Sequence, residues 1–494
     1  MAGYGSARPV TLPRLGVGGI AAAAATSIAA LICGWLIANS HQDVLLAFCA
    51  GVGALVLAKM WPGPFVALMA LVIMNGVPVV DLSRQLIGSF GIQDCAVFAL
   101  AGGLYWYRGD IVGGRERRVA RIAAIWAACF VAWWIITFAR SVLYEGIPIR
   151  YAASYGRDFL YFAILLPLVV RARLPLRSLR HGAWLILVGV VVFVVGQIGS
   201  SLSGHELSLL VHPTQSNETS GQLRIYSPMA TIVSTSLIFV AACLLAGGAP
   251  RRRAAMTTLV ALLTVSVALQ LTRSDYAAMV VALVVGVAVH SLRGGSFTAV
   301  IMRIAMASLA IAVVVIALGV TNVGNSAIGG VATRVAERAE SGVSAVSNTS
   351  GTFRYRTQLN AKMLNILGAQ WPIGLGFLNP KAHYVAGLPE GAIRNADVGV
   401  FNVLMTMGVI GGLFIYVPLL YGFIELLRAV GTWKRLGLSE RRWIAYGGTA
   451  WIAWVLVGSW NLVVLFSVPG LVLTALVLGC LTQATATALA PGRS

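Results

Sequence analysis

The residues best able to do chemistry lie between Ser350 and Gly411, where charged side chains gather between two long apolar segments. One arginine guanidinium can bind two phosphate oxygens at once, and it stays charged. A carboxylate or an imidazole can accept a proton. Gly374 and Gly376 permit a close backbone turn. We interpret the stretch as the lid and half of the active site of a membrane-embedded enzyme. Its charged residues are Arg354, Arg356, Lys362, Lys381, His383, Glu390, Arg394 and Asp397.

The rest of the chain has the composition of a membrane protein. It has 494 residues, of which 58% are hydrophobic and 11% charged, and its mean hydropathy is +0.85. A soluble chain carries about a quarter charged residues. Apolar runs of about 20 residues recur along the chain, which predicts an all-α, polytopic helical membrane protein with about 14 transmembrane helices. The expected spans are 16–38, 44–61, 64–80, 92–108, 119–139, 158–171, 183–202, 228–248, 254–271, 275–292, 301–320, 398–427, 442–460 and 462–484.

The net charge of +20 follows from the way basic residues are distributed among the connections. If the N-terminus is cytoplasmic, most of the 36 basic residues fall in cytoplasmic connections, as the positive-inside rule predicts. Both termini are then cytoplasmic, and nucleic-acid binding is not needed to explain the charge. The 6 cysteines lie in or beside apolar segments without ligand spacing, so they are interpreted as core residues.

The connections predicted to lie outside differ sharply in length. We expect transmembrane helices 1–11 with short outer loops over residues 1–320, a large outer loop over 321–397, and helices 12–14 with a cytoplasmic C-terminus over 398–494. A connection as long as 321–397 is unusual in a compact protein unless it is functional.

The second half of the large loop should contain an amphipathic helix. Leu359, Met363, Ile366 and Leu367 recur at helical spacing from Thr352 onward. Two helix-ending residues follow, Gly368 and Pro372. We expect this helix to lie in the outer interface with its apolar side on the bundle.

The short outer connections carry further arginines. Arg224 stands four residues before Pro228, which opens a span, and Arg273 lies at the membrane edge in the tight connection 272–274. Asp275 falls where a first-turn acid stabilises a helix start. The fragment 140–157 is moderately amphipathic and holds Arg140, Arg150 and Arg157.

Taken in order, these elements resemble the O-antigen polymerase and ligase superfamily of bacterial inner-membrane glycosyltransferases. The resemblance covers roughly residues 220–420. It departs at Asp397, where many members have a histidine. The matching residues are Arg224 before Pro228, Arg273 between small residues, Arg356 at the opening of a helix, Pro372, Gly374 and Gly376 in a P-x-G-x-G turn, and Gly408 and Gly411 in a G-x-x-G segment.

The resemblance implies a metal-independent, GT-C-like glycosyltransferase in the bacterial cytoplasmic membrane, with its active site facing outward. A hydroxyl of an acceptor would displace undecaprenyl diphosphate from a polyprenyl-diphosphate-linked oligosaccharide. Asp397 or His383 would take or orient the proton, and Arg356 would act with them. Arg224, Arg273, Arg354 and Arg394 would bind diphosphate or glycan beside the Gly374–Gly376 turn. No metal and no cofactor are expected.

Several alternatives stay open. The arginines could instead snorkel to lipid headgroups or pair with acids, and Asp397 could serve only as a first-turn acid. The enzyme could be a repeat-unit polymerase or a ligase with a lipid or protein acceptor, and membrane lipids and a chain-length regulator are candidate partners. A lipid-linked oligosaccharide flippase is the alternative from another class. It should show charges inside spans and related halves, and the sequence shows neither clearly.

Overall fold

A computed structural model describes most of the chain after residue 56. The chain divides into two units, 1–56 and 57–494, and every helix and strand named below belongs to the second. The expected spans 16–38 and 301–320 lie outside the described residues, as does the first half of 44–61. Apart from the isolated residues Gly53 and Leu207, the described ranges are 56–77, 85–87, 90–107, 114–203, 215–219, 222–247, 250–270, 273–292, 352–377, 399–435, 441–461 and 463–488.

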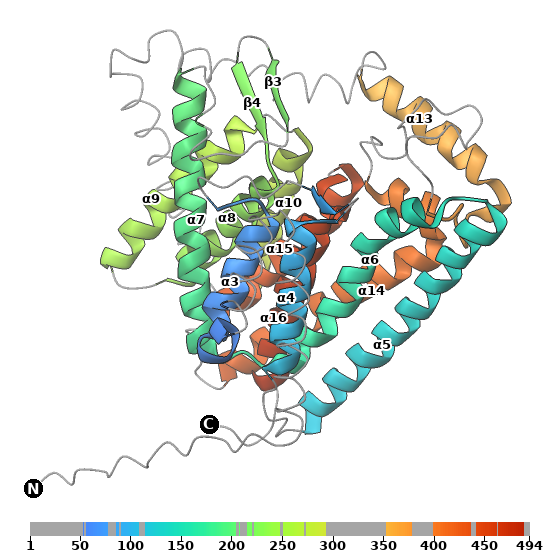
Figure 1. The fold of residues 1–494 in the computed structure, drawn as a ribbon. Coiled ribbons are helices and arrows are strands. Elements are labelled where there is room, and N and C mark those ends of the chain that lie inside the picture. The colour runs from blue at the N-terminus through green and yellow to red at the C-terminus, as the bar shows by residue number, and fades with distance from the viewer. Residues whose placement is uncertain are drawn as a thin grey trace, which may run out of the picture. The chain divides into compact units, whose positions relative to one another are not determined.

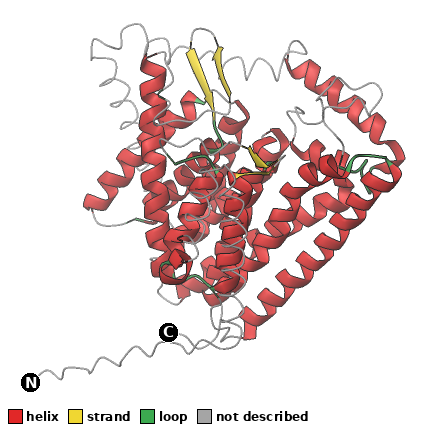
Figure 2. Cartoon of the chain, in the orientation of Figure 1, coloured by secondary structure: helices red, strands yellow, loops and turns green. Residues whose placement is uncertain are grey.

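Helices make up nearly all of the described structure (Figures 1 and 2). They are α3 (Pro62–Ile73), α4 (Ile92–Trp106), α5 (Gly114–Ala139), α6 (Ile149–Ala172), α7 (Leu176–Ser203), α8 (Met229–Ala246), α9 (Pro250–Leu269), α10 (Arg273–Leu292), α13 (Thr352–Leu367), α14 (Gly399–Arg435), α15 (Arg442–Asn461) and α16 (Val468–Ala488).

Eight of the described helical segments are long and apolar enough to cross a membrane. This finding confirms the helical membrane class. The expected number of 14 spans stays a prediction, because several of the segments concerned lie outside the described residues. The eight are 114–144, 149–172, 177–201, 229–246, 252–269, 275–292, 399–433 and 468–486.

Helix packing in the second unit brings distant parts of the chain side by side. α6 packs against α5 and α16, and α14 packs against α5, α15 and α16. Figure 1 shows α5, α6 and α14 running alongside one another. α15 in turn packs against α8 and α10. Its indoles Trp451 and Trp454 are among the largest fully buried side chains of the described core.

The region 140–157 differs from the expected outer connection. It forms a π-helix, η1 (Arg140–Tyr144), that continues α5, followed by the first turns of α6 from Ile149. The expected span 158–171 was therefore too short. The polar residues that suggested a loop are used inside the bundle. Arg157 Nη1 donates to Asp94 Oδ2 of α4 at 3.0 Å and lies 3.8 Å from Asp158, and Tyr155 donates to the Asn402 side chain.

Two short antiparallel hairpins were not anticipated. β1 (Gln85–Ile87) pairs with β2 (Phe90–Gly91) just before α4. β3 (Gln215–Thr219) pairs with β4 (Gln222–Tyr226), and β4 leads through Pro228 into α8. Within this second hairpin, Arg224 lies opposite Asn217.

Helix α14 is broken near its start, although a continuous span was expected. Gly408 has φ 66° and ψ −169°, which is not a helical conformation. After the break the helix continues to Arg435, well past the predicted span end at 427.

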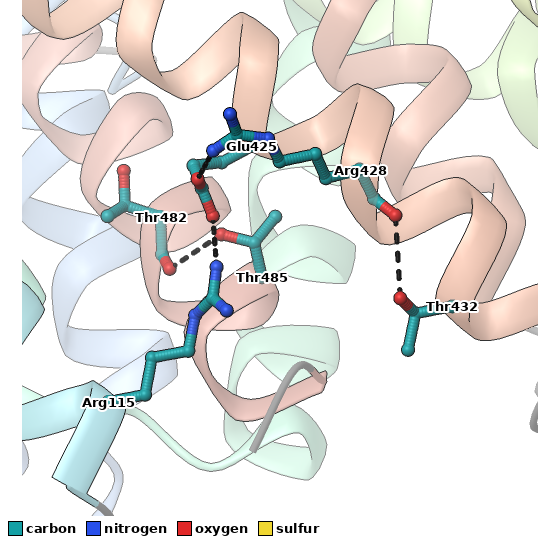
Figure 3. Close-up of polar contacts among 6 residues, drawn as sticks. All are labelled: Arg115, Glu425, Arg428, Thr432, Thr482 and Thr485. Carbon is teal, nitrogen blue, oxygen red and sulfur yellow. Dashed lines mark hydrogen bonds and ion pairs between the residues drawn. The ribbon is translucent and has the colours of Figure 1, made fainter. Parts of the chain in front are cut away.

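Ion pairs join the first turn of α5 to the second half of α14 (Figure 3). Glu425 Oε2 accepts from Arg115 at 2.6 Å, and its Oε1 accepts from Arg428 at 2.8 Å. Arg173 at the end of α6 pairs with Glu116. These arginines were all predicted to be cytoplasmic. The opposite end of α5, at Arg140, lies roughly 40 Å away along a 26-residue helix.

Candidate functional site

The P-x-G-x-G turn fills the break in α14. A break at Gly408 removes two helical hydrogen bonds, so the amides of residues 409 and 410 and the carbonyls of residues 405 and 406 lose their partners. The turn replaces all of them. Its bonds are Leu375 N to Met405 O at 2.7 Å, Gly376 N to Thr406 O at 2.9 Å, Val409 N to Trp371 O at 3.0 Å and Ile410 N to Pro372 O at 3.2 Å.

The replacement of the lost helical hydrogen bonds by bonds to the turn matters in a membrane protein. An unpaired backbone group away from water costs several kcal/mol. Within a membrane, irregular backbone is tolerated only where it is buried in protein or lines a water-filled cavity. The turn and the break therefore depend on each other, and we call the two together the interlock (residues 370–377 and 405–410).

The interlock requires glycine at its closest approach. Gly374 and Gly408 both have positive φ, at 73° and 66°. A Cβ atom on Gly408 would lie 2.3 Å from the Pro372 carbonyl oxygen, and one on Gly374 would lie 2.5 Å from the Gly408 nitrogen. Each glycine thus makes room for the other's segment, which explains why both positions are glycine.

The C-terminal end of α5, continued by η1, holds the other side of the turn. Arg140 donates through Nη1 to the Gly374 carbonyl and through Nη2 to Gln370 Oε1 at 2.8 Å. Ser141 Oγ accepts from the Phe377 amide at 2.6 Å and donates to the Thr137 carbonyl at 2.7 Å. Both residues stand in the π-helix η1, a helix type that is frequent at functional sites.

An aromatic anchor ends the turn. The Phe377 side chain is fully buried, and its ring centroid lies 5.6 Å from that of Trp134 and 6.3 Å from that of Phe159. Gly156 gives the ring space, because a Cβ there would come within 2.8 Å of Phe377. The Trp134 indole also donates to the Gly156 carbonyl at 2.6 Å, so α5, α6 and the turn meet at one point.

Helix α13 precedes the turn as the sequence predicted. It runs from Thr352 to Leu367, and Gly368 follows with φ 42°. Met363 and Leu367 are buried, whereas Leu364 is exposed. An apolar side packed on the bundle is therefore confirmed for the part of the helix whose side chains are described.

The structure brings together some of the predicted site residues and leaves others undetermined. Gly374, Gly376, Pro372, Gly408 and Gly411 meet in the interlock or beside it. The backbone positions of four arginines are described, and their side chains are not: Arg354 and Arg356 lie in the first turns of α13, Arg273 is the first residue of α10, and Arg224 lies in β4. Three predicted residues, His383, Arg394 and Asp397, lie outside the described residues.

The start of α10, where Arg273 stands, is fixed by a buried carboxylate. Asp275 is only 3% exposed. Its Oδ1 accepts from the Trp454 indole of α15 and its Oδ2 from the Ser234 hydroxyl of α8, both at 2.8 Å. The predicted first-turn acid is confirmed. In addition it ties three helices together, which the sequence did not reveal.

Sequence reasoning missed Arg140 and Ser141 as parts of the site. Both were assigned to an outer connection, and their partners lie more than two hundred residues further along the chain. The only sequence signal for a role of Arg140 in the site was its location in an arginine-bearing segment that was predicted to lie outside. Among the described residues no group of three or more His, Cys, Asp or Glu side chains could hold a metal ion. The expectation that no metal takes part stays a prediction.

These features define a polytopic helical membrane protein in which a glycine-rich turn is locked into a break in a long apolar helix. Residues 258–416, about a third of the chain, match the family model described as O-antigen ligase. The match confirms the resemblance to the O-antigen polymerase and ligase superfamily, and it indicates a membrane enzyme that processes glycans. It spans α10, α13, the turn and the break in α14. No curated protein matches the chain.

Proposed function

We propose that this protein is a membrane glycosyltransferase that transfers a polyprenyl-diphosphate-linked glycan to a hydroxyl acceptor on the outer face of the bacterial cytoplasmic membrane. The observation that carries the proposal is the interlock. It lies within the family-matched segment and joins the two glycine motifs, which stand on either side of residues 378–398. The segment that holds His383, Arg394 and Asp397 is thereby attached at both ends to packed helices.

The proposed reaction forms a bond between an acceptor oxygen and the anomeric carbon of the donor sugar. The bond from that carbon to the diphosphate oxygen breaks, and the electron pair leaves with undecaprenyl diphosphate. The acceptor's proton passes to Asp397 or His383. Arg356 and Arg273 would stabilise the departing charge, with Arg224, Arg354 and Arg394 as further contacts, since charge-assisted hydrogen bonds contribute about 1.5–3 kcal/mol each.

Within this class we favour a repeat-unit polymerase, which joins glycans that both stay on the polyprenyl carrier. The supporting feature is Asp397, which occupies the place where ligases and many polymerases of the superfamily have histidine, while polymerase-like branches tolerate an aspartate. A ligase is the second candidate, and the description of the matching family model favours it.

The glycolipids of cells that lack the gene would test the proposal. We would complement such cells with the wild type, Arg356→Ala or Asp397→Ala. Lys362→Ala serves as the matched control, because Lys362 is an exposed cation on the same helix as Arg356. A polymerase predicts single repeat units on the carrier, corrected by the wild type and the control but not by the two site variants.

Other outcomes would replace this assignment. Long chains on the carrier without an acceptor would indicate a ligase. Glycolipid confined to the cytoplasmic leaflet, together with full activity of Arg356→Ala and Asp397→Ala, would contradict the enzyme and favour a flippase.

A further inference from the structure

The Arg140 side chain donates hydrogen bonds mainly to the turn. Its guanidinium has three described partners: the Gly374 carbonyl, Gln370 Oε1 and, at 3.4 Å, Glu145 Oε1. The first two belong to the turn and the third to the same connection as Arg140. The side chain is only 18% exposed, so its bond to the Gly374 carbonyl is partly shielded from water and stronger than a surface contact.

The neighbouring Ser141 reaches the same turn by a different route. Its hydroxyl is fully buried, accepts the Phe377 amide and donates to the Thr137 carbonyl. Arg140 therefore binds a carbonyl of the turn, and Ser141 binds an amide three residues later. Together they fix the turn's orientation from the side opposite α14.

We infer that Arg140 and Ser141 are positioning residues for the site: they hold the P-x-G-x-G turn against the end of α5, and helix α13, which carries Arg356, ends directly before that turn. This inference rests on the proposed function for its catalytic consequence. Arg140 acts through the backbone of the turn and need not touch substrate.

Arginine is the side chain that this role requires. A planar guanidinium can donate to two or three acceptors in different directions at once. A lysine ammonium could keep the contact with the Gly374 carbonyl, but its single nitrogen could not reproduce the fixed fork toward Gln370 and Glu145. A graded response from arginine through lysine to glutamine is thus the signature of a positioning role.

Hydrogen exchange on the purified full chain in detergent tests the physical part. The amides of Leu375, Gly376 and Phe377 are bonded to α14 and Ser141. In Arg140→Gln we expect these amides to exchange about tenfold faster or more, since a hydrogen bond to a charged group is lost. Arg140→Lys should fall between, and Ser141→Ala should act mainly on Phe377.

Arg150→Gln is the matched control. Arg150 is an exposed arginine ten residues further on, and its described contacts are with its neighbour Tyr151. We expect unchanged exchange at residues 375–377 in this variant. If exchange there is equally slow in Arg140→Gln and the wild type, the inference is wrong. If Arg140→Gln does not accumulate, the milder Ser141→Ala decides the question by the same measurement.

The glycan product separates this inference from the proposed function. In Arg140→Gln, faster exchange at the turn with a severalfold loss of polymer, at unchanged protein level and melting temperature, supports both the positioning role and the proposed function. Faster exchange with normal polymer would refute the positioning role. If cells lacking the gene show no glycan defect, the proposed function fails, while the exchange data still decide whether Arg140 holds the turn.

Discussion

Gly374 and Gly408 each occupy space that the other's backbone needs. Their positive φ values and the 2.3–2.5 Å approach of a hypothetical Cβ leave no room for any other residue. The sequence showed these glycines as parts of two separate motifs. It could not show that they touch, because the pairing depends on the helix break, and a glycine within an apolar run is compatible with an unbroken span.

Gly408→Ala should undo the interlock. The added methyl group would meet the Pro372 carbonyl and impose a strained φ, so we expect a loss of about 2 kcal/mol or more in unfolding free energy and a severalfold drop in glycan product. Thermal unfolding in detergent and glycolipid profiles would measure both.

Gly412→Ala is the control for this variant. It lies one helical turn further along α14, and a Cβ there meets nothing closer than 4.0 Å. It should leave stability and product near wild type. Equal behaviour of Gly408→Ala and Gly412→Ala would contradict the interlock as described.

Asp275 illustrates a second residue whose local role was predictable and whose long-range role was not. Asp275→Ala would leave the Trp454 indole and the Ser234 hydroxyl buried without their acceptor, which should cost about 2–4 kcal/mol. Asp275→Asn keeps one acceptor oxygen and should cost less. Thermal melts of the two variants would test this order, and a reversed order would show that the carboxylate is not the acceptor that holds α8 and α15.

At the scale of elements, α5 is joined to α14 by two tryptophans of similar geometry. Trp133 donates to the Met407 carbonyl, next to the break, and Trp126 donates to the Phe414 carbonyl further along the helix, both at 3.2 Å. Trp133 lies beside the break and Trp126 does not. A comparison of the two can therefore distinguish general packing of α5 on α14 from specific support of the break.

Trp133→Phe and Trp126→Phe should therefore differ in function more than in stability. Each loses one hydrogen bond, so each should cost about 1 kcal/mol of unfolding free energy. Only Trp133→Phe is expected to lower glycan product, because its lost bond lies beside Gly408. Similar product losses in both variants would mean that α5 acts on α14 as a whole.

Hydropathy predicted where most described helices lie, and it missed several of their ends: α7 begins at Leu176 instead of 183, and α16 at Val468 instead of 462. The starts of α8, α10, α14 and α15 fall within two residues of expectation. α6 was cut short because Arg157 looked like a loop residue, whereas Asp94 satisfies its charge within the bundle. The hydropathy of one segment does not reveal the polar partners that another segment supplies to it.

At the scale of the whole second unit, α5 has one end at the Arg115–Glu425–Arg428 cluster shown in Figure 3. Its other end, continued by η1, lies at the interlock. If the positive-inside distribution sets the topology, the cluster faces the cytoplasm and the turn faces outward. The proposed lipid-linked donor would then be used on the outer face.

Cysteine labelling in intact cells would check this orientation. In a variant without native cysteines, Tyr144→Cys should react with a membrane-impermeant maleimide, since Tyr144 is 82% exposed beside Arg140. Arg118→Cys, exposed near the start of α5, should react only after permeabilisation. The reverse pattern would place the interlock in the cytoplasm and overturn the proposed sidedness.

The interlock also changes the chain entropy of this region. The bonds from Leu375 to Met405 and from Gly376 to Thr406 each join two points that are 30 residues apart in the sequence. Holding such points together costs roughly 3 kcal/mol of closure entropy on a simple logarithmic estimate. That cost is met during folding, so a substrate that binds beside the turn does not have to supply it on each catalytic cycle.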